Sequence, residues 1–227
     1  PGYRVDLRQR PHGIAGPIVH SVDQAYRYYD LQGRTWERQA YVKARPAAGS
    51  IALGQAFLAR LEPWIYRRYL SRADISGIKA LKRKIEQRAE REGGSPRDPM
   101  LCRGGARDVE FAVQFLQLLN GGELEELRVP SMLEALASLA QTGCVTEQER
   151  SRLAEGYDFL RTVGHRLQPT MERETKALPD DPEDLARLAK GVGSRAEDEP
   201  ASVESFEAQF ALAAKTNREI LDRLLRE

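Results

Sequence analysis

The amino-acid sequence predicts a mainly α-helical fold that begins with a small β remnant. Near the N-terminus, residues 3–10 alternate between apolar and charged side chains, and this period of two is typical of a half-buried strand. From about residue 20 onward, apolar residues recur every three or four positions, as they do on the buried face of a helix. Most of these segments begin at a capping residue or end at glycine or proline. We therefore expect one or two strands followed by a helical bundle.

Two short strands are expected before residue 20. In the first, three apolar side chains would lie on one face and four charged side chains on the other: Tyr3, Val5 and Leu7 against Arg4, Asp6, Arg8 and Arg10. Pro11 ends this strand, and a glycine-rich turn leads to the apolar pair Ile18 and Val19, which predicts a second strand. Because the chain begins within the first strand and without an initiator methionine, we expect the complete protein to have a preceding portion.

Helices are expected from residue 21 to the C-terminus. In the first half, a helix is opened by a capping box of Ser21 and Gln24 and ended by Gly33, and a second runs from about Thr35 to Arg45. One or two helices are expected over residues 51–70, with a break near Pro63. The next helix has an apolar stripe of Ile75, Ile78, Leu81 and Ile85, and the basic residues that lie off this stripe are Lys79, Lys82, Arg83 and Lys84.

The second half of the sequence contains the most apolar segment. After a loop over residues 92–105, residues 109–119 are apolar on nearly all sides and predict a central buried helix. Later helices are expected at the capping boxes Ser131/Glu134 and Thr146/Glu149, at Asp181-Pro182 and from about Ser202, with a linker over residues 191–200. The helix that begins at Thr146 is long. Gly164 is expected to weaken it, and Pro169 is expected to end or kink it near Gln168.

Composition excludes several classes of protein. The chain has 35 Lys and Arg against 34 Asp and Glu, whereas a general nucleic-acid-binding protein usually has a clear basic excess. Its two cysteines do not suggest a disulfide framework and favour a reducing compartment. No apolar run approaches the roughly 20 residues that span a membrane, and no signal peptide is visible. We expect a cytoplasmic protein that binds neither nucleic acid nor membrane.

Asp6 is the first candidate for chemistry, because it would share a strand face with arginines on both sides. A salt-bridged sheet face would explain this pattern, and for the isolated segment it is the favoured interpretation. The alternative is a carboxylate that ligates Mg²⁺ beside arginines that hold phosphate oxygens, since Mg²⁺ usually takes one or two carboxylates plus substrate phosphates. Arginine suits phosphate because its planar fork binds two oxygens at once.

A second candidate is the segment from Arg34 to Arg45. On a helix, the arginines at 34, 38 and 45 would fall near one face, whereas Trp36, Ala40 and Lys43 would share another. A solvated charged helix would explain the arginines but not a tryptophan and a lysine on one stripe. Contacts with the phosphate and the adenine of a nucleotide would explain both.

The diglycine Gly104-Gly105 is the third candidate. It precedes Arg107 and a buried helix whose first turn contains Asp108 and Glu110. An acidic first turn that complements the helix dipole is one explanation. A phosphate bound at the helix start is the other, although the sequence lacks the Gly-Lys-Ser or Gly-Lys-Thr of a Walker A loop. The three histidines fit structural roles better: His12, His20 and His165.

Taken in order, these segments resemble the glutamine synthetase adenylyltransferase family, whose members are bifunctional adenylyltransferase and adenylyl-removing enzymes. The similarity extends from the start to about Pro179. The matching runs are Tyr-Arg-Val-Asp-Leu-Arg-x-Arg-Pro at 3–11, Gly-Pro-x-Val at 16–19, Gln-Gly-Arg-x-Trp-Glu-Arg-Gln-Ala at 32–40, Lys-Ala-Arg-Pro at 43–46 and Gly-Gly-x-Arg-Asp-x-Glu-Phe at 104–111.

The resemblance implies a nucleotidyltransferase, specifically part of its adenylyl-removing half. The features resembling that half are Gln32-Gly33-Arg34, Lys43 and Arg107. In the family, three carboxylates bind two metal ions, and Asp6 matches the third. The implied reaction removes AMP from a tyrosine of glutamine synthetase with phosphate and yields ADP, with Mg²⁺ as cofactor and ATP, ADP or phosphate as substrates. The implied partners are glutamine synthetase and a PII-type signal protein.

The implied site residues follow the motifs one by one. Asp6 would be the catalytic metal ligand, and the implied phosphate and nucleotide contacts are Arg8, Arg10, Arg38, Lys43, Arg45, Gly104, Gly105 and Arg107. Residues 1–50 would be the end of a nucleotidyltransferase domain and residues 51–227 a helical bundle domain. With one of three metal ligands, this chain is expected to be inactive alone.

Two alternatives remain open at this point. One is another enzyme of the same superfamily, such as a uridylyltransferase acting on a signal protein; the runs at 36–38 and 43–45 argue against it. The other is a non-catalytic helical interaction module. It is favoured because two of the family's three metal-binding carboxylates have no match here, and because the sequence departs from the family pattern at Met100, Cys102, Gly164 and Lys176.

Overall fold

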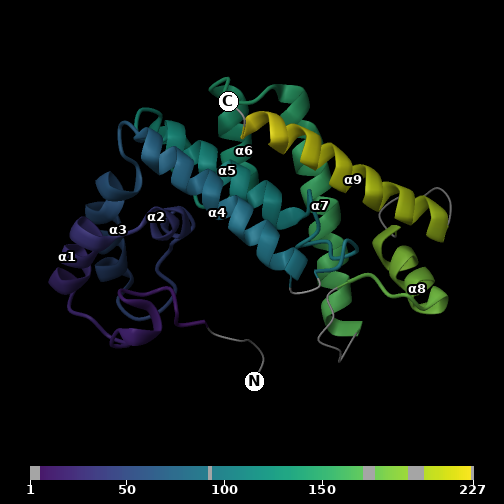
Figure 1. The fold of residues 1–227 in the computed structure, drawn as a ribbon, viewed down its shortest axis with the longest axis horizontal. Coiled ribbons are helices and arrows are strands. Elements are labelled where there is room, and N and C mark those ends of the chain that lie inside the picture. Colours follow the sequence, from purple (N-terminus) through teal and green to yellow (C-terminus); the bar gives the residue numbers. More distant parts are fainter. Residues whose placement is uncertain (1–5, 92–93, 171–176, 194–201, 226–227) are drawn as a thin grey trace. The chain divides into compact units, whose positions relative to one another are not determined.

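The computed structural model describes residues 6–91, 94–170, 177–193 and 202–225 and is shown in Figure 1. These residues form nine α-helices, two 3-10 helices and no β-strand, which confirms the mainly α prediction. The helices are α1 (Val22–Gln32), α2 (Thr35–Tyr41), α3 (Ile51–Ile65), α4 (Arg72–Arg91), α5 (Ala106–Asn120), α6 (Met132–Gln141), α7 (Glu147–Thr170), α8 (Pro182–Gly193) and α9 (Val203–Leu224), with 3-10 turns at Gly13–Ala15 and Glu125–Leu127.

The chain divides into two compact units. Unit 1 comprises Pro1–Ile78 and Gln114–Ala135, and unit 2 comprises Lys79–Val113 and Leu136–Glu227. This division reflects which residues pack together and does not mark the extent of a catalytic domain. The expected boundary at residue 50, which concerns the extent of a nucleotidyltransferase domain, stays a prediction.

The segment before α1 is a turn, not the predicted pair of strands. Residues 3–5 lie outside the described residues, but neither 6–10 nor 18–19 is a strand. The guanidinium of Arg10 instead donates hydrogen bonds to three backbone carbonyls: that of Leu7, that of Gly16 at 3.1 Å and that of Pro17 at 3.1 Å. A strand needs a neighbouring strand to satisfy its backbone groups, and among the described residues none is present.

In unit 1, α1 and α2 both pack against α3 (Figure 1). The predicted capping box of Ser21 and Gln24 opens α1, and Gly33 ends it. A β-carbon at Gly33 would lie 2.4 Å from the ring of Trp64, so only glycine permits α3 to approach this closely. The Trp64 ring in turn contacts Tyr29 and Tyr41, with centroids 5.1 and 6.0 Å apart.

Two helix ends in unit 1 differ from the prediction. Helix α2 ends at Tyr41, not Arg45, because the next three backbone N–H groups bond three residues back and tighten the last turn. Helix α3 continues through Pro63 to Ile65. Leu61 and Ile65 are both buried, so packing around the proline offsets its missing N–H group.

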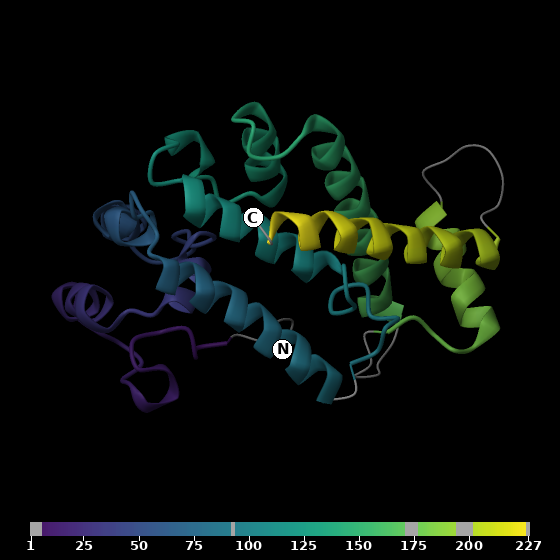
Figure 2. The ribbon, with the colours of Figure 1, turned by 45° about the horizontal axis from the view of Figure 1, so that its top comes forward.

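In unit 2, α7, α8 and α9 contact one another, and Figure 2 shows α9 crossing α7. Leu153, Leu160 and Leu167 of α7 are buried, as predicted. The starts of three helices are also confirmed, because side chains cap them at the predicted positions: Thr146 with Glu149 for α7, Asp181 for α8 and Ser202 for α9. In the described ranges, no helix is long and apolar enough to cross a membrane.

Helix α4 contains one clear error of prediction. Lys82 was expected off the apolar stripe, yet it is only 5% exposed, whereas Ile85 is 39% exposed. The side chain of Lys82 is buried because it meets two carboxylates, those of Glu86 and Asp108. Burial of a charge is tolerated when such partners are present.

Helix α7 offers a matched pair of glycines. It continues through Pro169 to Thr170, so it does not end at Gln168. A β-carbon at Gly164 would have its nearest neighbour, the sulfur of Met100, at 3.6 Å, which is ordinary contact. At Gly156 it would lie 2.6 Å from the side-chain oxygen of Asn217.

Gly164→Ala is therefore expected to stabilise the protein by up to about 1 kcal/mol, because alanine has the higher helix propensity and fits the space. Gly156→Ala is expected to destabilise it, because Asn217 is buried and its side-chain amide donates a hydrogen bond to the carbonyl of Gly104, which a shift would break. Urea denaturation of both variants checks this. Loss of stability in Gly164→Ala would show that the glycine has a packing role.

Candidate functional site

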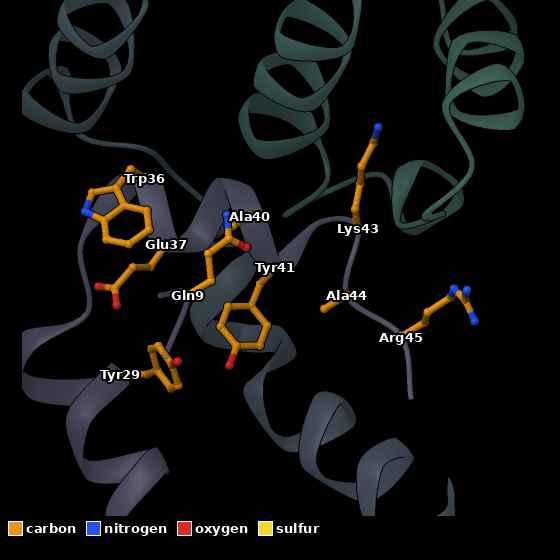
Figure 3. Close-up of a pocket in the computed structure, with 9 residues that line it drawn as sticks. All are labelled: Gln9, Tyr29, Trp36, Glu37, Ala40, Tyr41, Lys43, Ala44 and Arg45. Carbon is orange, nitrogen blue, oxygen red and sulfur yellow. The ribbon is translucent and has the colours of Figure 1, made fainter. Parts of the chain in front are cut away.

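A pocket of about 430 Å³ lies in unit 1 (Figure 3). Pockets that hold small molecules are usually of this size. Its lining residues come from the N-terminal turn, α1, α2 and the connection after α2: Gln9, Tyr29, Trp36, Glu37, Ala40, Tyr41, Lys43, Ala44 and Arg45. The structure thus brings together Trp36, Ala40 and Lys43, which the sequence placed on one stripe.

The two ends of the pocket differ chemically. In Figure 3, Trp36 lies at one end, Lys43 and Arg45 lie at the other, and Gln9 and Tyr41 stand between them. The charged ends of Lys43 and Arg45 point away from the tyrosine rings. Trp36 is 38% exposed, so one part of its indole surface is open to a ligand. The pocket therefore combines an aromatic end with a cationic rim.

The tyrosines of the pocket keep their protons. Burial and the neighbouring Tyr41 raise the pKa of Tyr29, and burial raises the pKa of Tyr41. Both phenols are therefore neutral at physiological pH and add no negative charge beside the cationic rim.

The one carboxylate that lines the pocket is already engaged. Glu37 accepts hydrogen bonds from the hydroxyl of Tyr28 at 2.9 Å and from the backbone N–H of Arg34 at 2.8 Å, which caps α2. Burial, together with the bond to Glu37, raises the pKa of Tyr28. Glu37 is buried and serves to hold α1 and α2 together.

Arg38 was expected to clamp phosphate, but it is buried inside unit 1 with 2% of its surface exposed. Its Nε donates to the carbonyl of Trp64 at 2.8 Å, and its Nη1 lies 3.5 Å from the carboxylate of Asp74. The guanidinium also lies 5.2 Å from the centroid of the Trp64 ring. These contacts argue against a direct bond from Arg38 to phosphate.

Asp6 and Arg8 form an exposed ion pair with each other. The carboxylate of Asp6 accepts from the backbone N–H of Arg8 at 2.9 Å and from its guanidinium at 2.5 to 3.0 Å, which raises the pKa of Arg8. The described residues contain no group of three His, Cys, Asp or Glu that could hold a metal ion. Asp6 alone does not make a Mg²⁺ site, and its role as a metal ligand stays a prediction.

The diglycine belongs to unit 2, and its backbone N–H groups are used within the chain. Gly104 donates to Asp108 at 3.0 Å, Gly105 to the carbonyl of Cys102 at 2.8 Å and Ala106 to that of Pro99 at 3.0 Å. Both glycines are buried, whereas Arg107 is exposed. This arrangement argues against the phosphate cradle expected for Gly104 and Gly105.

Close packing explains the diglycine better. A β-carbon at Gly104 would lie 1.9 Å from the carbonyl oxygen of Ala214 in α9, and its φ is +79°. The carbonyl of Gly104 accepts a hydrogen bond from the amide of Asn217 at 3.0 Å. The buried Asn217 also lies against Gly156 of α7. Gly104 is thus the point where the loop before α5 meets α9.

Sequence reasoning missed a cluster of charged residues in unit 2. Arg218 of α9 lies 2.6 Å from Glu86, 3.9 Å from Asp108 and 3.0 Å from Asp222, and Lys82 contacts both Glu86 and Asp108. Burial raises the pKa of Glu86, but Arg218 and Lys82 outweigh it and lower that pKa overall. The sequence does contain a signal for the burial of Lys82, because Lys82 shares a helical face with Ile78 and Ile85.

Both cysteines are free thiols: Cys102 and Cys144. Cys102 is buried, and burial, helped by Asp108 and Asp98, raises its pKa to about 12. A thiol with this pKa is protonated and unreactive at neutral pH.

Comparisons with known proteins agree with the sequence motifs. Residues 79–225 match the family model described as GlnD PII-uridylyltransferase, and residues 1–60 match that of glutamate-ammonia ligase adenylyltransferase.

Three similar curated relatives are each described as a bifunctional glutamine synthetase adenylyltransferase/adenylyl-removing enzyme. The relative from Mesorhizobium japonicum is 41% identical over 195 residues, which is 84% of this chain and 20% of that protein. The one from Agrobacterium fabrum is 39% identical over 217 residues, 94% of this chain and 22% of that protein. The one from Xanthomonas campestris pv. campestris is 41% identical over 191 residues, 84% of this chain and 20% of that protein.

The chain spans about a fifth of the length of these relatives. The model match over most of the helical part and the identity to these relatives over most of the chain together show that it belongs to the glutamine synthetase adenylyltransferase family.

Proposed function

We propose that the pocket of unit 1 binds a nucleotide or its phosphate groups, and that the complete protein transfers and removes AMP on a tyrosine of glutamine synthetase. The observation that supports this most directly is the pairing of an aromatic end with a cationic rim in one pocket. A purine base would stack on Trp36, and its phosphates would meet Lys43 and Arg45. Stacking of a base on an aromatic side chain contributes about 1–3 kcal/mol.

Within this family we assign the chain to the adenylyl-removing half. In that reaction, an oxygen of inorganic phosphate bonds to the phosphorus of the adenylyl group. The bond between this phosphorus and the tyrosine oxygen breaks, the tyrosine regains a proton and ADP leaves. Negative charge accumulates on the phosphate oxygens during such transfers, and cations next to them stabilise it. In this proposal Lys43 and Arg45 do this, and Lys43 is also one of the sequence features that resemble the removing half.

The partners of the complete protein are proposed on the same grounds. Glutamine synthetase is named in the descriptions of the relatives. A PII-type signal protein is proposed as the regulator, and the description of the family model that matches residues 79–225 supports it.

A uridylyltransferase acting on a signal protein is the second candidate, because the helical match carries that description. Two findings argue against it: residues 1–60 match the model of glutamate-ammonia ligase adenylyltransferase, and the relatives are described as glutamine synthetase adenylyltransferases. Incubating the full-length protein with adenylylated glutamine synthetase and phosphate, and separately with a PII protein and UTP, distinguishes the two. ADP formation in the first mixture supports the proposal. Uridylylation in the second mixture alone would replace it, and activity in neither would favour a non-catalytic helical module.

The pocket itself can be tested by titrating ADP against this chain and following tryptophan fluorescence. Lys43→Ala/Arg45→Ala is expected to weaken ADP binding by about 10-fold or more, because charge-assisted hydrogen bonds to phosphate are lost. Lys84→Ala/Arg91→Ala removes the same charge from the exposed face of α4 and serves as the matched control. Equal affinities in the two double variants would show that ADP does not use this rim.

A further inference from the structure

Helix α2 supplies four of the residues that line the pocket: Trp36, Glu37, Ala40 and Tyr41. It is only seven residues long, and isolated helices shorter than about 12 residues are marginal in water. The position of the pocket walls therefore depends on the tertiary contacts that hold α2 in place.

Asp74, in the first turn of α4, makes two of these contacts. Its Oδ1 accepts from the hydroxyl of Thr35 at 3.4 Å and pairs with Arg38 at 3.5 Å. Thr35 and Arg38 are three residues apart, so one carboxylate contacts two successive positions on the same face of α2. Arg38 adds a second anchor through its 2.8 Å bond to the carbonyl of Trp64 in α3.

Asp74 is itself held firmly. Its Oδ2 accepts from the hydroxyl of Ser71 at 2.8 Å and from the backbone N–H of Ser71 at 3.2 Å, and its own N–H donates to Ser71. Arg67 lies 3.9 Å away. Burial raises the pKa of Asp74, but Ser71, Arg38 and Arg67 outweigh it and lower that pKa, so the carboxylate is ionised at neutral pH.

We propose that Arg38 and Asp74 are a positioning pair that fixes α2 on α3 and the start of α4, so that Trp36 and Lys43 are presented to the ligand. Neither residue touches the nucleotide. The ligand part of this inference rests on the proposed function, whereas the anchoring part does not.

Asp74→Asn distinguishes a positioning role of Arg38 from direct binding of phosphate, because the two roles predict different changes in ADP affinity. If Arg38 bound phosphate itself, removal of a nearby negative charge would leave ADP affinity unchanged or raise it. Positioning predicts the opposite, because a neutral amide in place of the carboxylate would hold the guanidinium weakly and α2 would shift. We expect Asp74→Asn and Arg38→Lys each to weaken ADP binding about 10-fold, with less than additive loss in the double variant.

Hydrogen exchange without ligand tests the anchoring alone. Asp74→Asn and Arg38→Lys should both speed exchange of the amides of residues 38–41, while α1 amides stay as slow as before. Asp23→Asn is the matched control, because it makes the same substitution at an exposed carboxylate of unit 1 that pairs with Arg60. It should leave α2 exchange and ADP affinity nearly unchanged.

Unchanged α2 exchange in Asp74→Asn would overturn the positioning pair. Faster α2 exchange in a chain whose ADP affinity is indifferent to Lys43→Ala/Arg45→Ala would instead confirm the pair and reject the proposed pocket function. A rise in ADP affinity in Asp74→Asn would assign phosphate contact to Arg38.

Discussion

Gly104→Ala is expected to destabilise the protein by roughly 3 kcal/mol or more, among the largest effects of any single substitution. The added β-carbon would lie 1.9 Å from the carbonyl oxygen of Ala214, and the residue has a left-handed φ of +79°. Because the obstacle is backbone, no side-chain rotation can relieve the clash. The loop before α5 and helix α9 would have to separate, which would expose part of the core of unit 2.

Circular dichroism during urea denaturation measures this effect. Gly191→Ala in α8 is the control, because a β-carbon there has open space around it, and its stability should be equal or higher. Near-normal stability in Gly104→Ala would show that α9 can shift without cost.

Under the proposed function, Asp6→Asn is expected to reduce adenylyl-tyrosine phosphorolysis by the full-length protein by orders of magnitude, with little change in melting temperature. The predicted role as a metal-ligating carboxylate requires its charge, and the substitution keeps its shape. The ion pair with Arg8 is solvent-exposed, and exposed pairs contribute little to stability.

A melting curve and a rate must be measured on the same Asp6→Asn protein. Asp23→Asn, at another exposed carboxylate of unit 1, is the control and should retain full activity. A folded Asp6→Asn protein with a near-normal rate would remove Asp6 from the mechanism.

The parts of the fold that the sequence predicts well are those decided locally. The caps at Ser21, Thr146 and Ser202 need only a side chain and the N–H group two or three residues later, so the pattern alone reveals them. The same holds for the buried residues of α7, whose spacing indicates one apolar face, and for those of α5, which is apolar on nearly all sides.

The features that the sequence did not reveal depend on partners distant in the sequence. Lys82 is buried because Asp108 lies 26 positions later, and Arg38 because Asp74 lies 36 positions later. The packing of Gly104 depends on Asn217, which lies 113 positions later and donates a hydrogen bond to the carbonyl of Gly104. The predicted strand likewise depends on a neighbouring strand, which a local pattern cannot supply.

In the candidate site, helical spacing predicted that Trp36, Ala40 and Lys43 lie together, and all three line the pocket although α2 ends at Tyr41 and Lys43 follows it. The contributions of Tyr29 and Gln9 could not, because they come from other segments of the chain. Sequence reasoning therefore finds residues that are close together in the sequence, whereas the opposite wall of a pocket requires the tertiary fold.

The contact of Asn217 with both Gly104 and Gly156 also determines how α9 can move. A helix held only by apolar side chains can slide by one turn at modest cost, because each side chain finds a similar neighbour. A buried amide finds its acceptor at a single register, so α9 is either docked at that register or detached. We therefore expect α9 to leave the rest of unit 2 in an all-or-none step, with the amides along its length exchanging at one common rate.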